Sequence, residues 1–273
     1  MYRLLATDID DTLLAPDGSL PAANHDALVR LHEAGITIVF CSGRSDTSIR
    51  KVAAPILEPA DDEYYIGFNG ARTVTAKSRT IVSRRYLTGP SVSRVVAYAR
   101  KHALHVQGYA GDAFVVEVDD ECTRKYAEAT ATVASIVPDL SAALAEGSPK
   151  LLIVGTHEEL LAHRDALRAM SNASPRGERF SVMFSKPKYL EIVSEGVHKG
   201  DALVRLAETL GIPIEATLAV GDADNDAEML RAAGTGVAVA NAHPGAKAAA
   251  DVVLEASAAD GAMAVVAKRY FGV

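Results

Sequence analysis

Hydrophobic and polar positions alternate along the first third of the chain in a way that predicts strands separated by helices. A short apolar segment ends at Asp8, and apolar residues at helical spacing then run to a stop at Gly35. A continuous β-branched and apolar run follows, as expected for a buried parallel strand. The predicted elements are a helix over 21–34, a strand over 36–40, a helix over 46–57 and a strand over 64–68. This alternation predicts right-handed crossovers and a parallel sheet.

The last third of the chain repeats the alternation, whereas the middle third does not. A helix over 200–210, strands over 217–220 and 236–240 and an Ala-rich helix are predicted after the middle region. Between them, strand patterns such as 114–118 mix with Gly-, Pro- and Ser-rich loops. We therefore predict an α/β fold, with a Rossmann-like doubly wound parallel sheet core and an inserted α+β domain. The core covers 1–83 and 190–273 and the insertion covers 84–189.

Composition limits the classes of function. The net charge of −7 argues against nucleic-acid binding by phosphate neutralisation, but it allows a small phosphate ligand. No stretch approaches the roughly 18 uninterrupted apolar residues of a membrane span, and no secretory signal precedes the first acids. The two cysteines do not form a disulfide framework. We expect a cytoplasmic protein without nucleic-acid or membrane partners, and its oligomeric state stays open.

Polar clusters follow several of the predicted core strands. Asp8, Asp10 and Asp11 stand within four residues, and three such acids repel one another unless a cation lies among them. The carboxyl ends of parallel strands meet at one edge of a sheet, where ligands bind. The other clusters are Ser42-Gly43-Arg44, His198-Lys199-Gly200 and Gly221-Asp222 with Asn225-Asp226. Together they predict an acidic site at this edge that suits a metal ion.

The order and spacing of these clusters resemble the haloacid dehalogenase superfamily of aspartate-nucleophile phosphatases, and within it the Cof-type branch with a large α/β cap domain. Asp8-x-Asp10-x-Thr12 matches the first motif of the family, Ser42 to Arg44 the second, Lys199 the third and Asp222-x-x-Asn225-Asp226 the fourth. Asn69-Gly70-Ala71 and Leu190-Glu191-Ile192 match on either side of the insertion. The chain departs from the pattern at Asp11, where many relatives carry Gly, and at Leu254 and Ser257, where Thr and Asn are usual.

The resemblance implies a Mg²⁺-dependent phosphomonoesterase that hydrolyses small phosphorylated metabolites, such as sugar phosphates or phosphorylated cofactors. The reaction passes through an aspartyl-phosphate, which splits one difficult step into two. Asp8 is the expected nucleophile, Asp10 the general acid and base, and Lys199 the positive charge beside them. The expected phosphate ligands are Asp11, Ser42, Gly43, Arg44 and Asn225. The expected metal ligands are Asp8, Asp10 through its carbonyl, Asp222, and Asp226 through metal-bound water.

Two other functions share parts of this residue set. A phosphomutase of the same superfamily also forms an aspartyl-phosphate, but such enzymes mostly carry a helical cap soon after the first motif. A non-catalytic phosphoreceiver or ligand-sensing module also has an acidic pocket and a lysine, but it is about half this length. A dehalogenase has no need of Asp10 and Asp222. The phosphatase is therefore the leading hypothesis.

Several further residues have a plainer interpretation. We expect Cys41 to be a small packed residue, His198 a solvated neighbour of Lys199, Asp224 an exposed residue and Asn241 a brace for a loop. In the insertion, no residue is assigned to substrate selection. The candidates weighed there, each expected at the surface or in the core, are His105, Tyr109, Asp112, Arg124 and Lys186.

Overall fold

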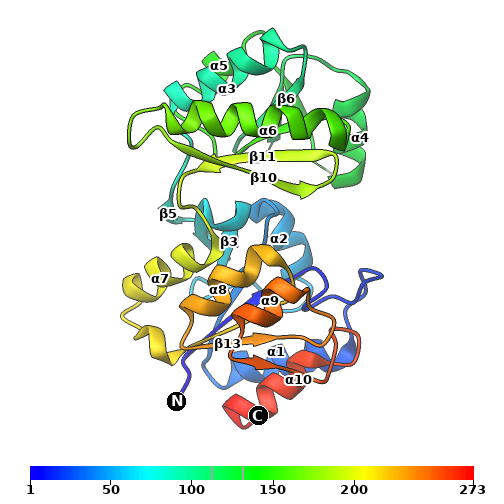
Figure 1. The fold of residues 1–273 in the computed structure, drawn as a ribbon. Coiled ribbons are helices and arrows are strands. Elements are labelled where there is room, and N and C mark those ends of the chain that lie inside the picture. Colours follow the sequence, from blue (N-terminus) through cyan, green and yellow to red (C-terminus); the bar gives the residue numbers. More distant parts are fainter. Residues whose placement is uncertain (112, 131) are drawn as a thin grey trace. The chain divides into compact units, whose positions relative to one another are not determined.

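The chain forms two compact units, Met1–Arg84 with His198–Val273, and Arg85–Val197 (Figure 1). The structure is a computed structural model that describes residues 1–111, 113–130 and 132–273. The sequence predicted a return to the first unit at 190. That boundary is wrong by several residues, because the strand β11 (Tyr189–Ser194) pairs with two strands of the second unit.

The described residues of the first unit form an eight-stranded sheet in the order β14-β13-β12-β1-β2-β3-β4-β5. Strands β14 to β3 in this order are parallel, and β4 and β5 extend the sheet as an antiparallel hairpin that the sequence analysis did not predict. The bounds are β1 (Leu4–Asp8), β2 (Thr37–Cys41), β3 (Tyr64–Gly67), β4 (Arg72–Thr75), β5 (Ile81–Arg84), β12 (Thr217–Gly221), β13 (Thr235–Ala238) and β14 (Val252–Val253). The predicted doubly wound α/β core is confirmed.

Helices cover both faces of this sheet. The chain steps from β1 to β2 in one direction and from β12 to β13 in the other, so right-handed crossovers place α1 and α8 on opposite faces. The helices are α1 (Ala22–Glu33), α2 (Asp46–Ala53), α7 (Lys199–Thr209), α8 (Ala227–Ala232), α9 (Pro244–Ala249) and α10 (Ala262–Val266), with short turns η1 (Phe68–Gly70), η2 (Ile214–Ala216), η3 (Asp224–Asp226) and η4 (Ala267–Phe271). Helix α2 ends four residues before the predicted position, because Pro55 has no N–H to continue it.

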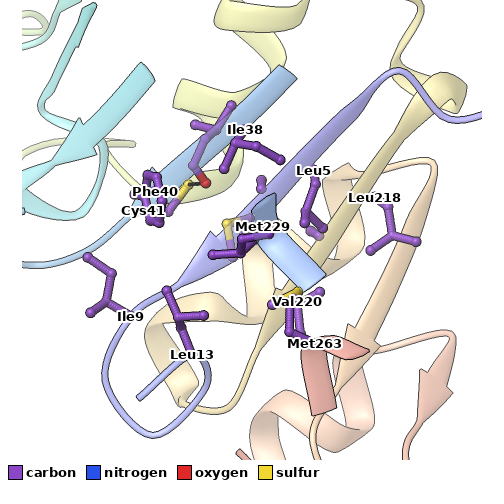
Figure 2. Packing of buried hydrophobic residues seen from close by; sticks show 14 of the residues in the cluster. Leu5, Ile9, Leu13, Ile38, Phe40, Cys41, Leu218, Val220, Met229 and Met263 are labelled. Carbon is purple, nitrogen blue, oxygen red and sulfur yellow. Dashed lines mark hydrogen bonds between the residues drawn. The ribbon is translucent and has the colours of Figure 1, made fainter. Parts of the chain in front are cut away.

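The core of the first unit is apolar and lies between the sheet and its helices. Figure 2 shows Leu5 and Ile38 from the central strands beside Met229 of α8. Cys41 lies in this cluster with no exposed surface, which confirms its interpretation as a packed residue. Burial raises the pKa of its thiol far above the usual value. The apolar packing fixes the strands whose carboxyl ends carry the polar clusters.

The second unit has its own sheet and its own core. Its described strands are ordered β10-β11-β9-β6-β7-β8, mostly antiparallel, with β7 and β8 parallel. Helices α3 and α6 supply the apolar residues that pack on one face. The bounds are α3 (Gly89–Lys101), β6 (His105–Ala110), β7 (Ala113–Val116), α4 (Glu121–Thr130), β8 (Ala134–Ile136), α5 (Leu140–Ala143), β9 (Leu151–Val154), α6 (His157–Asn172) and β10 (Phe180–Lys186). Within the described ranges, no helix combines the length and apolarity needed to cross a bilayer.

Candidate active site

Two carboxylates meet where the order of the central strands reverses. Asp8 is the last residue of β1, and Asp222 directly follows β12, the parallel partner of β1. The chain leaves these two strands in opposite directions, toward β2 and β13. In doubly wound sheets the crevice at such a reversal is the usual ligand site. The two acids therefore lie at the predicted edge of the sheet.

A third carboxylate and one ammonium complete a buried cluster. Carboxylate oxygens of Asp8, Asp222 and Asp226 lie within 4.8 Å of one another, and all three residues are buried. Lys199 Nζ donates to Asp8 Oδ1 at 2.5 Å and to Asp226 Oδ1 at 2.6 Å. Three carboxylates thus face one ammonium, which leaves two negative charges when all are ionised.

The protonation of this cluster follows from its burial and its charges. Burial raises the pKa of Asp222 to about 6, the hydrogen bond from Thr12 opposes the rise, and nearby Asp226 adds to it. Burial also raises the pKa of Asp8 well above its usual range, although Lys199 opposes this. For Lys199, burial disfavours the ammonium, but the two partner carboxylates still hold its pKa above the usual value. The cluster therefore favours the ammonium form of Lys199, and its three carboxylates carry more negative charge than this one ammonium balances.

Backbone and hydroxyl donors hold the acids in place. Asp226 Oδ2 accepts from the backbone N–H groups of Asp222, at 3.1 Å, and Ala223, at 3.0 Å. The Thr12 hydroxyl donates to Asp222 Oδ1 at 2.7 Å. Gly221 allows the close approach of Asp226, since a Cβ at Gly221 would lie 2.6 Å from the Cβ of Asp226. These contacts hold two of the three acids, Asp222 and Asp226, in the loop that follows β12.

Asp10 stands apart from the buried cluster. Its side chain is 52% exposed and forms a two-point ion pair with Arg44, whose Nε donates to Asp10 Oδ2 at 2.9 Å. We expected Arg44 to bind phosphate, and the structure instead pairs it with Asp10. This contact ties the loop after β1 to the loop after β2.

Asp11 occupies a strained backbone position held by Asn241. Its φ of 58° lies in the left-handed region that favours Gly. Asn241 Nδ2 donates to the Asp11 carbonyl at 2.7 Å, and Asn241 Oδ1 accepts from the Ala258 N–H at 2.9 Å. This confirms the prediction that Asn241 braces a loop.

Three of the predicted phosphate-binding residues, Ser42, Gly43 and Asn225, lie near Asn69. Ser42 is buried, and its hydroxyl oxygen accepts from the Arg44 N–H at 3.3 Å. A Cβ at Gly43 would lie 3.2 Å from the Asn69 amide, and Asn225 Nδ2 donates to Asn69 Oδ1 at 3.0 Å. We expected Asn225 to order Lys199 or a phosphate, and the structure gives it Asn69 as partner. Asn69 was predicted only as a motif residue, although its position in η1, the turn that follows the parallel strand β3, places it at the carboxyl-end edge of the sheet.

His198 has a structural role that sequence analysis missed. Its Nδ1 accepts from the Asp201 N–H at 3.0 Å and so caps the N-terminus of α7. It was expected to be a solvated neighbour of Lys199. The cap fixes the start of the helix on which Lys199 is the first residue, whereas Asp224 is exposed as expected.

The residues weighed in the insertion belong to the second unit and differ in environment. Tyr109 is buried, Arg124 pairs with Asp119 and Lys186 is exposed. His105 contacts Asp120. Asp112 lies outside the described residues.

The fold and the acidic cluster define the class: an α/β protein with buried carboxylates of the kind that bind Mg²⁺ at the switch point of a doubly wound sheet. The family model for haloacid dehalogenase-like hydrolases matches residues 5–266, so the chain belongs to this family. The predicted resemblance and the enzyme class are confirmed.

Curated relatives agree with this assignment. The chain is 33% identical over 247 residues to an HMP-PP phosphatase of Cronobacter sakazakii, with 89% of this chain and 86% of the relative covered. It is 30% identical over 247 residues to an HMP-PP phosphatase of an Enterobacter species, with the same coverage.

Solved structures share the whole architecture. A haloacid dehalogenase-like hydrolase from Bacteroides thetaiotaomicron superposes with a TM-score of 0.88 at 27% identity, over 98% of this chain and 99% of that one. A Thermotoga maritima protein gives the same TM-score at 28% identity, over 98% and 97% of the two chains. Both units therefore belong to the shared fold.

Proposed function

We propose that the protein is a Mg²⁺-dependent phosphomonoesterase acting on small phosphorylated metabolites. The observation that carries the proposal is the buried set Asp8, Asp222 and Asp226, with the Lys199 ammonium paired to Asp8 and Asp226. Its two spare negative charges match a divalent cation. An all-oxygen donor set suits Mg²⁺, which uses few carboxylates and keeps several waters. Asp8 and Asp222 are the proposed direct ligands, with the Asp10 carbonyl, and Asp226 acts through metal-bound water.

Bound Mg²⁺ supplies positive charge that offsets the repulsion between the nucleophile and the phosphoryl group. In the first step an Asp8 oxygen forms a bond to phosphorus, the ester P–O bond breaks, and Asp10 gives a proton to the leaving oxygen. In the second step water attacks the phosphorus of the aspartyl-phosphate and passes a proton to Asp10. Inorganic phosphate leaves and the Asp8 carboxylate is restored.

The remaining residues position these groups. Lys199 holds Asp8 at 2.5 Å and supplies a compact charge to the phosphate. Ser42, Gly43, Asn225 and the Asp11 N–H are the proposed donors to the phosphate oxygens, since phosphoryl transfer depends mostly on positioning and charge. Arg44 orients Asp10 in the free enzyme and reaches the phosphate when Asp10 turns to the leaving group.

The substrate is proposed to be small because a separate unit is inserted between the halves of the core. Such an insertion acts as a cap that excludes bulk water during turnover. The HMP-PP phosphatases among the relatives make HMP-PP one candidate substrate. Sugar phosphates and phosphorylated cofactors are the wider candidate class.

A phosphatase panel tests the proposal. Phosphate release is measured from HMP-PP, sugar phosphates, pyridoxal phosphate and flavin mononucleotide, with Mg²⁺ and with chelator, for the wild type and Asp8→Asn. Metal-dependent release that is lost in the variant supports the proposal. Release that persists in Asp8→Asn contradicts it, and a stable acyl phosphate without release favours a phosphoreceiver instead.

A further inference from the structure

A second group of metal-binding side chains lies in the second unit, outside the acidic cluster. A ring nitrogen of His105, the Cys122 Sγ and a carboxylate oxygen of Asp120 all lie within 4.8 Å of one another. None of the three belongs to the proposed phosphatase chemistry. A thiol, an imidazole and a carboxylate form a ligand set typical of zinc-class ions and not of Mg²⁺.

The three residues stand on a rigid framework. His105 begins β6, where it pairs in register with Val154 of β9. Asp120 precedes α4, and its Oδ1 accepts from the Thr123 N–H at 2.8 Å, which caps that helix. Cys122 lies in the first turn of α4. Ligands held by a strand and a capped helix need little ordering when an ion binds.

His105 supplies the observation that points to a ligand. Its side chain is only 9% exposed, and its Nδ1 lies 2.8 Å from Asp120 Oδ2. The other ring nitrogen, Nε2, is buried and has no hydrogen-bond partner in the described part of the chain. A buried imidazole nitrogen without a partner is unfavourable. An imidazole that donates one N–H to a carboxylate and binds a metal through the other nitrogen is a recurrent arrangement.

We propose that His105, Asp120 and Cys122 bind a zinc-class divalent ion. Cys122 and His105 are ligands, and Asp120 is either a third ligand or the acceptor of the hydrogen bond from the His105 ring. Bonds of tetrahedral zinc place the ligand atoms about 3.3–3.8 Å apart. One His105 ring nitrogen, the Cys122 Sγ and an Asp120 oxygen already lie within 4.8 Å of one another, which exceeds this spacing by at most about 1.5 Å. Binding releases the Cys122 thiol proton to solvent as the sulfur–metal bond forms. The resulting thiolate and the Asp120 carboxylate balance the charge of the ion.

Cobalt substitution tests the proposal on the full chain. Metal-free protein, reduced with a phosphine, is titrated with Co²⁺ in excess Mg²⁺ so that the acidic cluster of the first unit is occupied. We expect one equivalent of Co²⁺ to give a thiolate-to-cobalt absorption band, which added Zn²⁺ removes. The oxygen donors of the first unit give no such band, so the outcome is independent of the phosphatase proposal.

Matched variants locate the site. Cys122→Ser should abolish the thiolate band, and His105→Gln should weaken Co²⁺ binding at least about 10-fold. The controls Cys41→Ala and His163→Gln should keep both the thiolate band and the affinity for Co²⁺. Circular dichroism of each metal-free variant shows that it folds, and Zn²⁺ protection of wild-type Cys122 against alkylation gives a second readout without mutation. A wild type with no thiolate band and no protection overturns the proposal, as does a band that survives Cys122→Ser.

Discussion

The Nζ atom of Lys199 lies 2.6 Å from Oδ1 of Asp226, and neither side chain is exposed to solvent. The same ammonium donates to Asp8, so one lysine neutralises parts of two buried carboxylates. Removal of one partner from such a group leaves a buried charge without compensation.

Lys199→Met should therefore lose both activity and stability. Because Asp8 and Asp226 both lose their cation, we expect a loss of about 3–5 kcal/mol in the free energy of unfolding without metal. Urea denaturation measures this loss. The double variant Lys199→Met/Asp226→Asn should recover part of the stability but none of the activity. Equal instability of the single and double variants would contradict the pairing.

Asp8→Asn should separate catalysis from folding. An amide is a poor nucleophile, so we expect phosphate release to fall by a factor on the order of 10⁴ or more. Burial raises the pKa of Asp8, which shows that its charged form is disfavoured. The neutral variant should thus be at least as stable as the wild type without Mg²⁺, as thermal unfolding can show. A destabilised variant would argue against this electrostatic account.

Mg²⁺ binding should weaken at acid pH through Asp222. The pKa of this group is about 6 without metal, so a proton competes with the ion below that value. The apparent dissociation constant for Mg²⁺ should rise about tenfold for each pH unit below 6. Calorimetric titration at several pH values measures it. A constant affinity from pH 7 to 5 would contradict this competition between the proton and the ion at Asp222.

The same shift predicts how stability depends on pH without metal. The ordinary pKa of an aspartate is 3.8, so between about pH 4 and 6 the folded state holds a proton that the unfolded state has released. The stability contributed by this group should then fall as pH rises through that window, by about 3 kcal/mol. Asp222→Asn should flatten this dependence in denaturation curves, whereas Asp224→Asn, an exposed control on the same loop, should not.

Arg44→Ala tests the role of the ion pair with Asp10. Without its partner, Asp10 loses its orientation, and we expect kcat to fall about 10- to 100-fold with little change in stability, since the pair is partly exposed. Steady-state kinetics and thermal unfolding give the two quantities. Arg231→Ala removes another exposed ion pair of the first unit and should leave kcat unchanged.

The loop after β1 offers a contrast between two substitutions. Asp11→Gly should keep or raise stability, because Gly adopts the φ of 58° at no steric cost. Asn241→Ala should cost about 1–2 kcal/mol, since it removes the hydrogen bonds to the Asp11 carbonyl and to the Ala258 N–H. Chemical denaturation compares them. Loss of stability in Asp11→Gly alone would contradict the assigned strain.

Much of the first unit could be predicted from the sequence because its periodicity is strong. The β-branched run before Cys41 and the short apolar run before Gly221 both became buried parallel strands. The hairpin β4–β5 was missed, since the buried strand β4 is mostly polar in sequence, β5 is partly exposed, and neither has a continuous apolar run. The boundary at 190 was misplaced because the pattern at Leu190 to Ile192 does not reveal the sheet to which that strand belongs.

The residue types of the site could be predicted from the sequence, but the ion pairs and hydrogen bonds among its side chains could not. The motifs predicted that Asp8 and Asp222 would meet, because parallel strands end at one edge, whereas Lys199 reaches them from the start of helix α7 and not from a strand of this sheet. The partner of Arg44 and the contact between Asn225 and Asn69 depend on loop conformations with no sequence period. His198 was missed as a helix cap because histidine is an uncommon residue at that position.

In the proposed reaction Asp8 carries the phosphoryl group during turnover. The most direct measurement is rapid acid quenching of the enzyme with Mg²⁺ and its preferred ester, followed by borohydride reduction and peptide mass spectrometry. We expect the peptide that contains Asp8 to carry the alcohol formed by reduction of the acyl phosphate. This product should appear at the first turnover and be absent in Asp8→Asn. Phosphate release with no reduced product at Asp8, or with the reduced product at another residue, would contradict the role of Asp8 as nucleophile.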